Sequence, residues 1–183
     1  GVAFLGVNAN RQDSMTELSA YANRHHVSFP LLKDGSHELA DLFAAERTPE
    51  VFVLNPAGDV KYHGRIDDQY GVGYSREEAD RHDLRVAIEE LLAGKAVSVP
   101  TTDVVGCHIG RSKEVEPSGD ITYSKHIAAI FQKRCLECHR DGEIAPFPLT
   151  QYDDVLGWED TILEVIEEQR MPPWFANPAH GKF

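Results

Sequence analysis

The clearest chemical signal in the sequence is a pair of cysteines followed at once by a histidine: Cys135, Cys138 and His139. This C-x-x-C-H spacing is typical of c-type haem attachment. The two thiols can add across the haem vinyl groups, and the adjacent imidazole can then bind the iron. Methionine sulfur is a common second axial ligand, and Met171 precedes two prolines that restrict the backbone. The motif therefore predicts haem c as cofactor, with His139 and Met171 as ligands of its iron.

Other chemistry is open to the same residues. A zinc site would need two further ligands besides the cysteine pair, and His139 with Cys107 or His180 could supply them. A thioredoxin-type dithiol is a second alternative, although such pairs occur near βαβ patterns, whereas this pair follows an amphipathic helical pattern. For the sixth iron position, His126 and His180 compete with Met171. A methionine can also simply fill a gap in a core.

Residues 120–183 contain the elements that must position this motif. The spacing of apolar residues predicts a helix that leads directly into Cys135 and a later helix over residues 152–169. With the CxxCH and RMPPW motifs, this order resembles small class I cytochrome c domains. The resemblance implies a Met-ligated haem that carries one electron at a time. It also implies a C-terminal helix for which too few residues follow Met171, so the predicted all-α cytochrome c domain is incomplete at its C-terminus.

The first 99 residues alternate between strand-like and helix-like patterns, in the order β-α-β-α-β-β-α. This order predicts an α/β domain with a mixed sheet. Residues 2–7 have the continuous apolar pattern of a strand covered on both faces. A cap at Asp13 or Ser14 predicts a first helix, residues 51–54 begin a predicted β-hairpin, and the last helix should end at Gly94.

This order, with the segment Arg47-Thr48-Pro49-Glu50 before a strand, resembles a thioredoxin-like domain of the redoxin type. The resemblance implies that Pro49 is a cis-proline beside the redox centre, although an ordinary loop proline is the alternative. It also implies a catalytic cysteine after the first strand, but no cysteine precedes Cys107. We therefore predict a thioredoxin-like α/β domain that is incomplete at its N-terminus, because it lacks its first βα unit.

Cys107 is the third cysteine, and several roles are open to it. In the intact protein it could be a redox thiol that pairs with a cysteine upstream of this sequence, or a metal ligand together with His108. It could also be a free or buried thiol, which is the usual fate of a single cysteine.

Linker-like composition separates the two predicted parts of the chain. The predicted domains are a thioredoxin-like domain over residues 1–99, a linker with Cys107 over residues 100–119, and a cytochrome c-like domain over residues 120–183. The absence of an initiating methionine and of a terminal stop signal favours an internal fragment. The acidic pair Asp67-Asp68 lies in a long loop that we interpret as solvated, with a cation site as the alternative.

The 183 residues carry 18 Lys and Arg against 30 Asp and Glu, a formal net charge of −12. That charge argues against nucleic acid as a partner, because each phosphate contact needs a cation. No apolar run is long enough to span a bilayer, so no membrane span is expected in this fragment.

Taken with both resemblances, the whole chain resembles bacterial multidomain redoxin–cytochrome c proteins. Some of these continue into a copper type II, ascorbate-dependent monooxygenase-like domain. The resemblances imply electron transfer through the haem, with redox proteins or adjacent domains of the parent chain as partners. They also imply a periplasmic or otherwise exported location. The alternative function is a thiol-disulfide oxidoreductase or peroxidase whose catalytic cysteine lies upstream, with the cytochrome as its redox partner.

Overall fold

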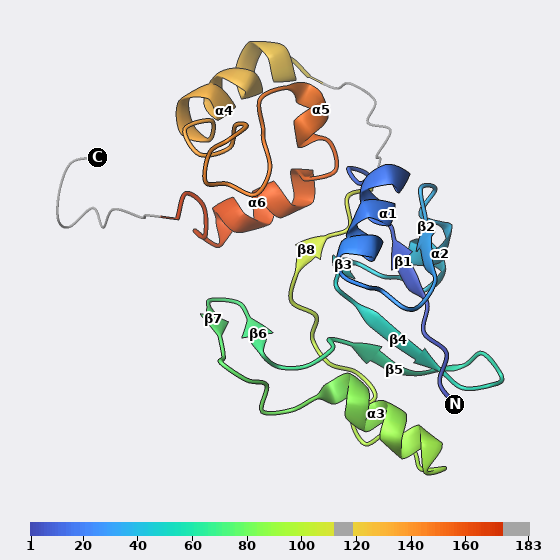
Figure 1. Cartoon of the computed structure of the whole chain (residues 1–183). Coiled ribbons are helices and arrows are strands. Elements are labelled where there is room, and N and C mark those ends of the chain that lie inside the picture. Colours follow the sequence, from blue (N-terminus) through green and yellow to red (C-terminus); the bar gives the residue numbers. More distant parts are fainter. Residues whose placement is uncertain (112–118, 174–183) are drawn as a thin grey trace, which may run out of the picture. The chain divides into compact units, whose positions relative to one another are not determined.

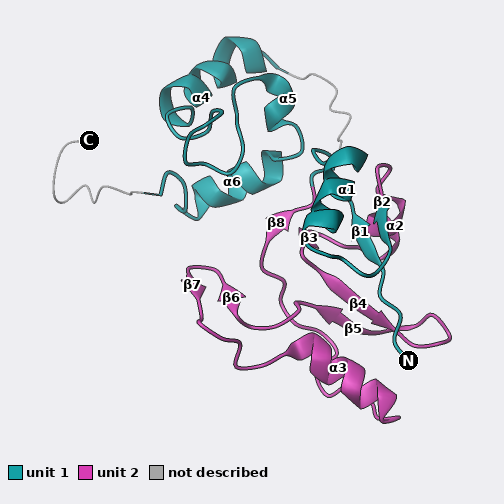
Figure 2. Cartoon of the chain, in the orientation of Figure 1, with its two compact units in different colours: residues 1–33, 110–183 teal, residues 34–109 magenta. Residues whose placement is uncertain are grey.

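The computed structural model describes residues 1–111 and 119–173 of the chain (Figure 1). The chain divides into two compact units (Figure 2): unit 1 comprises Gly1–Lys33 and Gly110–Phe183, and unit 2 comprises Asp34–Ile109. The domain boundaries at residues 99 and 119 stay a prediction.

The first part of unit 1 is a βαβ arrangement. Strand β1 (Gly6–Asn8) pairs in parallel with β2 (Leu31–Lys33), and helix α1 (Met15–Arg24) connects them. Parallel strands need such a crossover. Ser14 is the N-cap of α1 and forms a capping box with Glu17, which confirms the helix start predicted from the sequence.

The apolar run at residues 2–7 differs from the expectation. The regular strand begins only at Gly6, and Val2, Phe4 and Leu5 are exposed, by 43%, 52% and 55%. The prediction of a strand covered on both faces is therefore wrong for these residues. The physical reason is that β1 pairs with β2 alone among the described strands, so its sheet does not cover the run.

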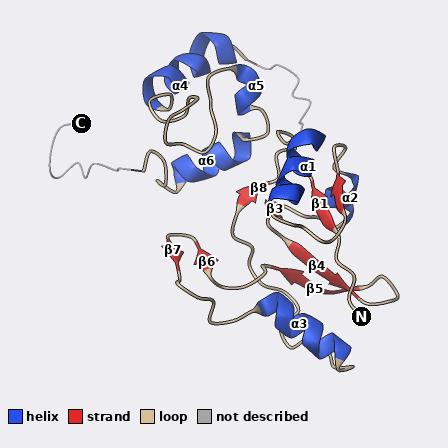
Figure 3. Cartoon of the chain, viewed as in Figure 1, coloured by secondary structure: helices blue, strands red, loops and turns tan. Residues whose placement is uncertain are grey.

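Unit 2 contains six short strands and two helices, drawn in red and blue in Figure 3. The strands are β3 (Arg47–Thr48), β4 (Val51–Leu54), β5 (Val60–Gly64), β6 (Tyr70–Gly71), β7 (Tyr74–Ser75) and β8 (Cys107–His108). The helices are α2 (Glu38–Leu42) and α3 (Asp83–Leu92). Three antiparallel pairs form, β4 with β5, β3 with β8 and β6 with β7.

The β4–β5 pair is the hairpin predicted from the sequence, with Gly58 at a φ of 88° in its turn. Tyr62 of β5 and Ala87 of α3 are each 1% exposed and lie in the core of this unit. Gly94, at a φ of 69°, follows the end of α3, as expected of a residue after a helix C-terminus.

The C-terminal helical segment (residues 119–173) belongs to unit 1. Its elements are the π-helix η1 (Tyr123–Ile127), α4 (Ala128–Arg134), α5 (Tyr152–Val155) and α6 (Glu159–Glu167). The single helix predicted over residues 152–169 is instead two helices, because Gly157 adopts a φ of 86° between them.

The core of this segment is a small apolar cluster. Phe131, Leu149 and Val155 are buried, and six half-buried side chains pack against them: Tyr123, Ile127, Cys135, Leu136, Phe147 and Ile162. None of the helices in the described ranges has the length and apolar character needed to cross a membrane.

Candidate functional site

The CxxCH motif forms a tight turn at the end of α4. Cys135 caps the helix, and its N–H donates to the Phe131 carbonyl at 2.8 Å. The Cys135 carbonyl in turn accepts the N–H of Cys138 at 3.1 Å and that of His139 at 2.9 Å. The two thiols and the imidazole are therefore carried by one helix-like turn that continues α4, as the motif requires.

The imidazole of His139 is oriented by the loop that follows. Its Nδ1 lies 3.0 Å from the Phe147 carbonyl oxygen, and its own carbonyl accepts the Leu149 N–H at 2.9 Å. A carbonyl can only accept, so Nδ1 must carry the proton of this contact. In a neutral ring with this tautomer, the other nitrogen, Nε2, carries the lone pair that a metal ligand needs.

Aromatic packing supports this loop. The ring of Phe147 lies 5.0 Å from that of His139 and stacks on Trp158 at 4.1 Å with an interplanar angle of 5°. Residues on both sides of the loop therefore restrict the position of the Phe147 carbonyl, which is the acceptor for His139.

The surroundings of the motif are apolar. Cys135 packs against the cluster of Phe131, Leu149 and Val155, and burial raises the pKa of its thiol. Several large apolar side chains of the C-terminal helical segment are exposed: Ile121, Ile130, Ile144, Leu163 and Ile166. The donor set of two thiols and one oriented imidazole on an apolar segment fits a covalently bound haem.

Met171 lies just beyond α6. Its N–H donates to the Val165 carbonyl at 2.9 Å, and its side chain is partly exposed, at 38%. Of the competing ligands, His126 is half-buried, and its Nδ1 accepts the Thr122 N–H at 3.1 Å. His180, like Trp174 of the RMPPW motif, lies outside the described residues. Met171 as the sixth ligand stays a prediction.

The zinc alternative requires a cluster of ligands. Within the described ranges, no three His, Cys, Asp or Glu side chains gather where they could hold a metal ion. All three cysteines are free thiols.

Cys107 lies in a strand, within the region that the sequence interprets as a linker. Strand β8 pairs with β3 so that Cys107 is opposite Thr48, and the Thr48–Pro49 peptide bond is cis. The Arg47 guanidinium donates to the Gly106 carbonyl at 2.8 Å. A Cβ on Gly106 would overlap the Thr48 carbonyl, so only glycine allows this close approach. The structure thus brings an exposed thiol next to the segment that carries Pro49.

Glu50 holds the same segment from the other side. Its carboxylate accepts the N–H groups of Glu46 at 2.8 Å and Arg47 at 2.9 Å, and it contacts Nε2 of His63. Burial acts to raise the pKa of Glu50, but these hydrogen bonds outweigh it and the pKa is lowered. Sequence reasoning missed this residue, because only its position directly after Pro49 distinguishes it from a surface glutamate.

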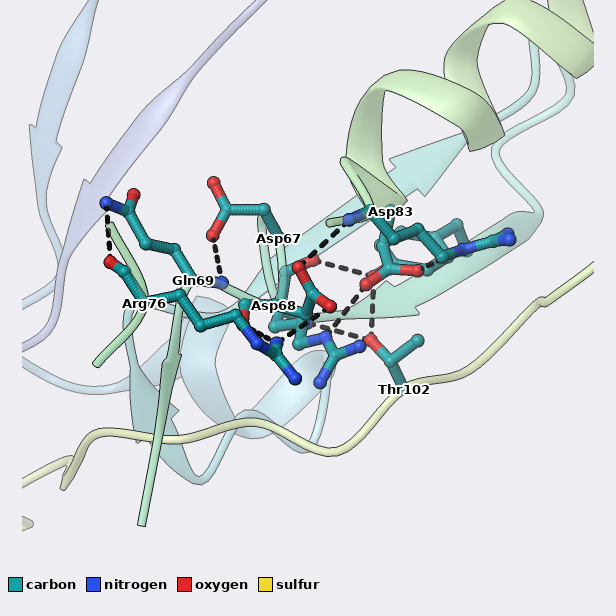
Figure 4. Close-up of polar contacts among 9 residues, drawn as sticks. Asp67, Asp68, Gln69, Arg76, Asp83 and Thr102 are labelled. Atoms are coloured by element: carbon teal, nitrogen blue, oxygen red, sulfur yellow. Dashed lines mark hydrogen bonds and ion pairs between the residues drawn. The ribbon is translucent and has the colours of Figure 1, made fainter. Parts of the chain in front are cut away.

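A second polar cluster, which the sequence did not reveal, lies around the loop after β5 (Figure 4). Asp83 accepts from Arg65 Nε at 2.8 Å and from Arg81 Nε at 2.6 Å. Asp68 accepts the Arg81 N–H at 2.9 Å and forms an ion pair with Arg76 at 2.8 Å. Asp68 is 8% exposed, so the interpretation of a solvated acidic pair is wrong for it, and its charge is already offset by Arg76.

Tyr62 completes this cluster. Its hydroxyl donates to the Arg65 carbonyl at 2.6 Å and lies 2.7 Å from Thr102 Oγ1, and burial raises its pKa. These contacts tie β5 to the segment after α3 within unit 2.

Unit 2 together with the βαβ arrangement of unit 1 has the element order of a thioredoxin-like protein, with a cis-proline before a strand. Consistent with this, residues 1–63 match the AhpC/TSA family. A hypothetical protein from Sinorhizobium meliloti 1021 has a similar crystal structure, with a TM-score of 0.52, 29% identity, and 58% of this chain and 60% of that chain covered. An uncharacterized conserved protein from Geobacillus kaustophilus has a TM-score of 0.52 and 26% identity, covering 65% of this chain and 62% of that one.

No match was found among curated proteins. The family match and the two structures support a thioredoxin-like redoxin fold for the N-terminal part of the chain, and the AhpC/TSA match suggests thiol-disulfide redox chemistry. The chain spans about three fifths of each of these two structures.

Proposed function

We propose that this chain is an electron-transfer part of a larger protein, in which a haem c bound at Cys135 and Cys138 is joined to a redoxin-type region. The observation that carries the proposal is the turn of Cys135 to His139 with Nδ1 of His139 held by the Phe147 carbonyl. A histidine that binds a metal almost always donates its other ring N–H to such an acceptor, which fixes the tautomer and the orientation of the ring.

Each residue of the site has a distinct task under this proposal. Cys135 and Cys138 would hold the cofactor by thioether bonds, and His139 would bind the iron through Nε2. The buried Phe131 and Leu149, against which Cys135 packs, would shield one side of the site from water. When bound, haem c supplies one-electron redox chemistry. The partly exposed Met171 would be the second axial ligand, and methionine at that position raises the reduction potential.

The test is to express the full chain behind a secretion signal in a host that matures c-type cytochromes. We expect a haemochrome spectrum and the added mass of one haem for the wild type. The double variant Cys135→Ser/Cys138→Ser should carry no haem, whereas Cys107→Ser, which removes the cysteine outside the motif, should carry as much as the wild type. A wild type without covalent haem, in a host that matures a reference cytochrome, would contradict the proposal.

The role of Met171 has a separate test. Met171→Ala should leave the haem attached, lower its potential and open the sixth position to added imidazole. If the spectrum of Met171→Ala were unchanged, the sixth ligand would instead be His126 or His180.

A second candidate function is favoured by the β3–β8 pair and the AhpC/TSA match. Cys107 is an exposed thiol opposite Thr48, beside the cis-proline Pro49. Under this alternative the parent protein is a thiol-disulfide oxidoreductase or peroxidase, and Cys107 pairs with a cysteine upstream of Gly1. Peptide mapping of the oxidised parent protein without reductant would show that disulfide. A parent protein whose Cys107→Ser variant keeps full peroxide and disulfide turnover would rule the alternative out.

The haem c proposal implies that the parent protein lies outside the cytoplasm, because haem c is attached on the exported side of the bacterial membrane. Its partners would be redox proteins or adjacent domains, such as a copper type II, ascorbate-dependent monooxygenase-like domain. The net charge of −12 favours basic docking surfaces on such partners. Fractionation of the source cells would test the location directly.

A further inference from the structure

The loop after the CxxCH motif contains a short segment, Ala-Pro-Phe-Pro-Leu at residues 145–149, that is hydrogen-bonded to the motif. We call this segment the strap. The N–H of its first residue donates to the Cys138 carbonyl at 3.2 Å. The carbonyl oxygen of its middle residue, Phe147, lies 3.0 Å from Nδ1 of His139. The N–H of its last residue donates to the His139 carbonyl at 2.9 Å. Three contacts at alternate residues therefore join the strap to the motif.

The two prolines of the strap suit this arrangement. Pro146 and Pro148 have no N–H, and they alternate with the residues that form the hydrogen bonds. Each proline ring fixes its own φ and disfavours the helical region for the residue before it. The backbone of the strap therefore has little freedom, and the Phe147 carbonyl that faces His139 is part of this restricted backbone.

The side chain of Phe147 is supported by Trp158. The two rings stack, with their centroids 4.1 Å apart and an interplanar angle of 5°. Trp158 is the N-cap residue of α6, and its carbonyl accepts the Ile162 N–H at 2.7 Å. It follows Gly157, whose φ is 86° and whose N–H donates to the Glu159 carboxylate at 2.6 Å. The backbone at the start of α6 thus holds the indole against which Phe147 packs.

The position of the Phe147 carbonyl has a chemical consequence for His139. A carbonyl only accepts hydrogen bonds, so this contact selects the tautomer with the proton on Nδ1 and leaves Nε2 for a metal ion. Donation of Nδ1–H to an acceptor also makes the imidazole a more basic ligand. A more basic ligand favours Fe(III) over Fe(II), so this hydrogen bond lowers the reduction potential of a haem that His139 binds.

We propose that Trp158 is a positioning residue for His139. By supporting the Phe147 ring, it keeps the Phe147 carbonyl within hydrogen-bond distance of Nδ1 and so fixes the tautomer and the orientation of the imidazole. The effect on the reduction potential rests on the proposed haem c. The positioning itself is a property of the protein chain and can be measured without haem.

The first test uses the full chain without haem, with isotope-labelled histidine. In NMR spectra the shifts of the two ring nitrogens show which of them carries the proton when the ring is neutral. We expect the Nδ1–H tautomer at His139 in the wild type and a mixture of tautomers in Trp158→Leu. Phe147→Leu removes the other ring of the stack but keeps the carbonyl, and it should act like Trp158→Leu.

Two further variants are controls. Trp158→Phe keeps an aromatic ring against Phe147 and should keep the Nδ1–H tautomer. Tyr152→Leu removes a different aromatic contact of the same helical segment, the Tyr123–Tyr152 pair with centroids 4.9 Å apart. It should also leave the tautomer of His139 unchanged.

The second test measures the reduction potential of the haem-loaded chain. Trp158→Leu should carry as much haem as the wild type, but its Fe(III)/Fe(II) equilibrium should shift toward Fe(II) by roughly three- to tenfold. At 59 mV per tenfold for one electron, this is a rise of about 30–60 mV. Trp158→Phe and Tyr152→Leu should have the potential of the wild type.

Several results would overturn the proposal. An unchanged tautomer in both Trp158→Leu and Phe147→Leu would show that the strap alone holds the carbonyl. An equal change in Tyr152→Leu would show general loosening of the segment. A changed tautomer with an unchanged potential would contradict the effect on the haem. A wild type that carries no haem would contradict the proposed function instead, and the measurement without haem would still decide the role of Trp158.

Discussion

Unit 2 and the C-terminal helical segment are held together in different ways. The four polar or charged residues that are buried as whole residues in the described part of the chain all lie in unit 2: Asp34, His37, Asp68 and Asp83. The helical segment buries Phe131, Leu149 and Val155 and leaves other large apolar side chains exposed, such as Ile144 at 87%.

The difference shows that unit 2 supplies partners for its own buried charges. In unit 2, buried carboxylates have arginine and backbone partners, so its interior is specified by directional interactions. The helical segment has a small core for its length, and natural small domains often add cross-links or cofactors to such a core. A covalently bound haem would supply such a link, which agrees with the placement of the CxxCH motif there.

The largest expected effect is in the helical segment. Phe131→Ala removes the aromatic ring from a core of three buried residues, and we expect it to lower the free energy of unfolding of this segment by about 4 kcal/mol. Hydrogen exchange should become fast in α4 and α6 but not in α3. The exposed neighbour Gln132→Ala is the control. Equal loss of protection in both units would mean that they unfold together.

In unit 2 the corresponding change is Asp83→Ala, which removes the shared partner of Arg65 and Arg81. The side chain of Asp83 is 2% exposed, while those of the arginines are 28% and 42% exposed. Because the arginines can regain water, we expect a loss of about 2–3 kcal/mol in the free energy of unfolding by urea. Asp80 forms an ion pair with Arg76, but its side chain is 79% exposed. We therefore expect Asp80→Ala to lower the free energy of unfolding by less than about 0.5 kcal/mol. Similar losses in both variants would show that burial of Asp83 is unimportant.

A smaller, pH-dependent effect is expected at Glu50. Its pKa in the folded state lies below the ordinary value of 4.5, so it contributes stability above that pH and the contribution is lost as the pH falls through the lowered pKa. Glu50→Gln should lower the free energy of unfolding of unit 2 by about 1–2 kcal/mol at neutral pH, because charge-assisted hydrogen bonds are lost. The gap between variant and wild type should close on acidification. A gap that persists below the lowered pKa, or appears in the exposed control Glu89→Gln, would contradict this account.

The smallest effect concerns a carboxylate of the helical segment. Asp154 accepts the Thr150 N–H at 2.9 Å and the Gln151 N–H at 3.0 Å at the start of α5. Desolvation acts to raise the pKa of Asp154, but the hydrogen bonds to Thr150 and Gln151 outweigh it and the pKa is lowered. Asp154→Asn should cost about 1 kcal/mol, as for other N-terminal capping groups, and Asp153→Asn should cost nothing measurable by thermal unfolding. If Asp154→Asn left the free energy of unfolding unchanged, the turn would be held by the apolar neighbour Val155 instead.

Local features were predictable from the sequence because they depend on neighbours along the chain. The capping box at Ser14 and the turn at Gly58 follow from short-range chemistry. The strand at residues 2–7 was over-predicted because apolar composition alone does not reveal whether anything covers it. The break at Gly157 was missed because the apolar stripe continues across it.

The candidate site divides in the same way. The spacing of Cys135, Cys138 and His139 is a property of the sequence, and it alone indicated a haem. The carbonyl of Phe147 that orients His139 became evident only in the folded loop, because any residue type can provide a carbonyl.

The sequence by itself therefore determined the chemical types at hand: a thiol pair with a histidine, a proline before a strand, and an excess of acid. Only the tertiary structure placed Cys107 opposite Thr48 and gave Asp68 and Asp83 their arginine partners. The reason is physical. Strand pairing and the burial of a charge are settled by residues far apart in the chain, whose mutual distances no local pattern records.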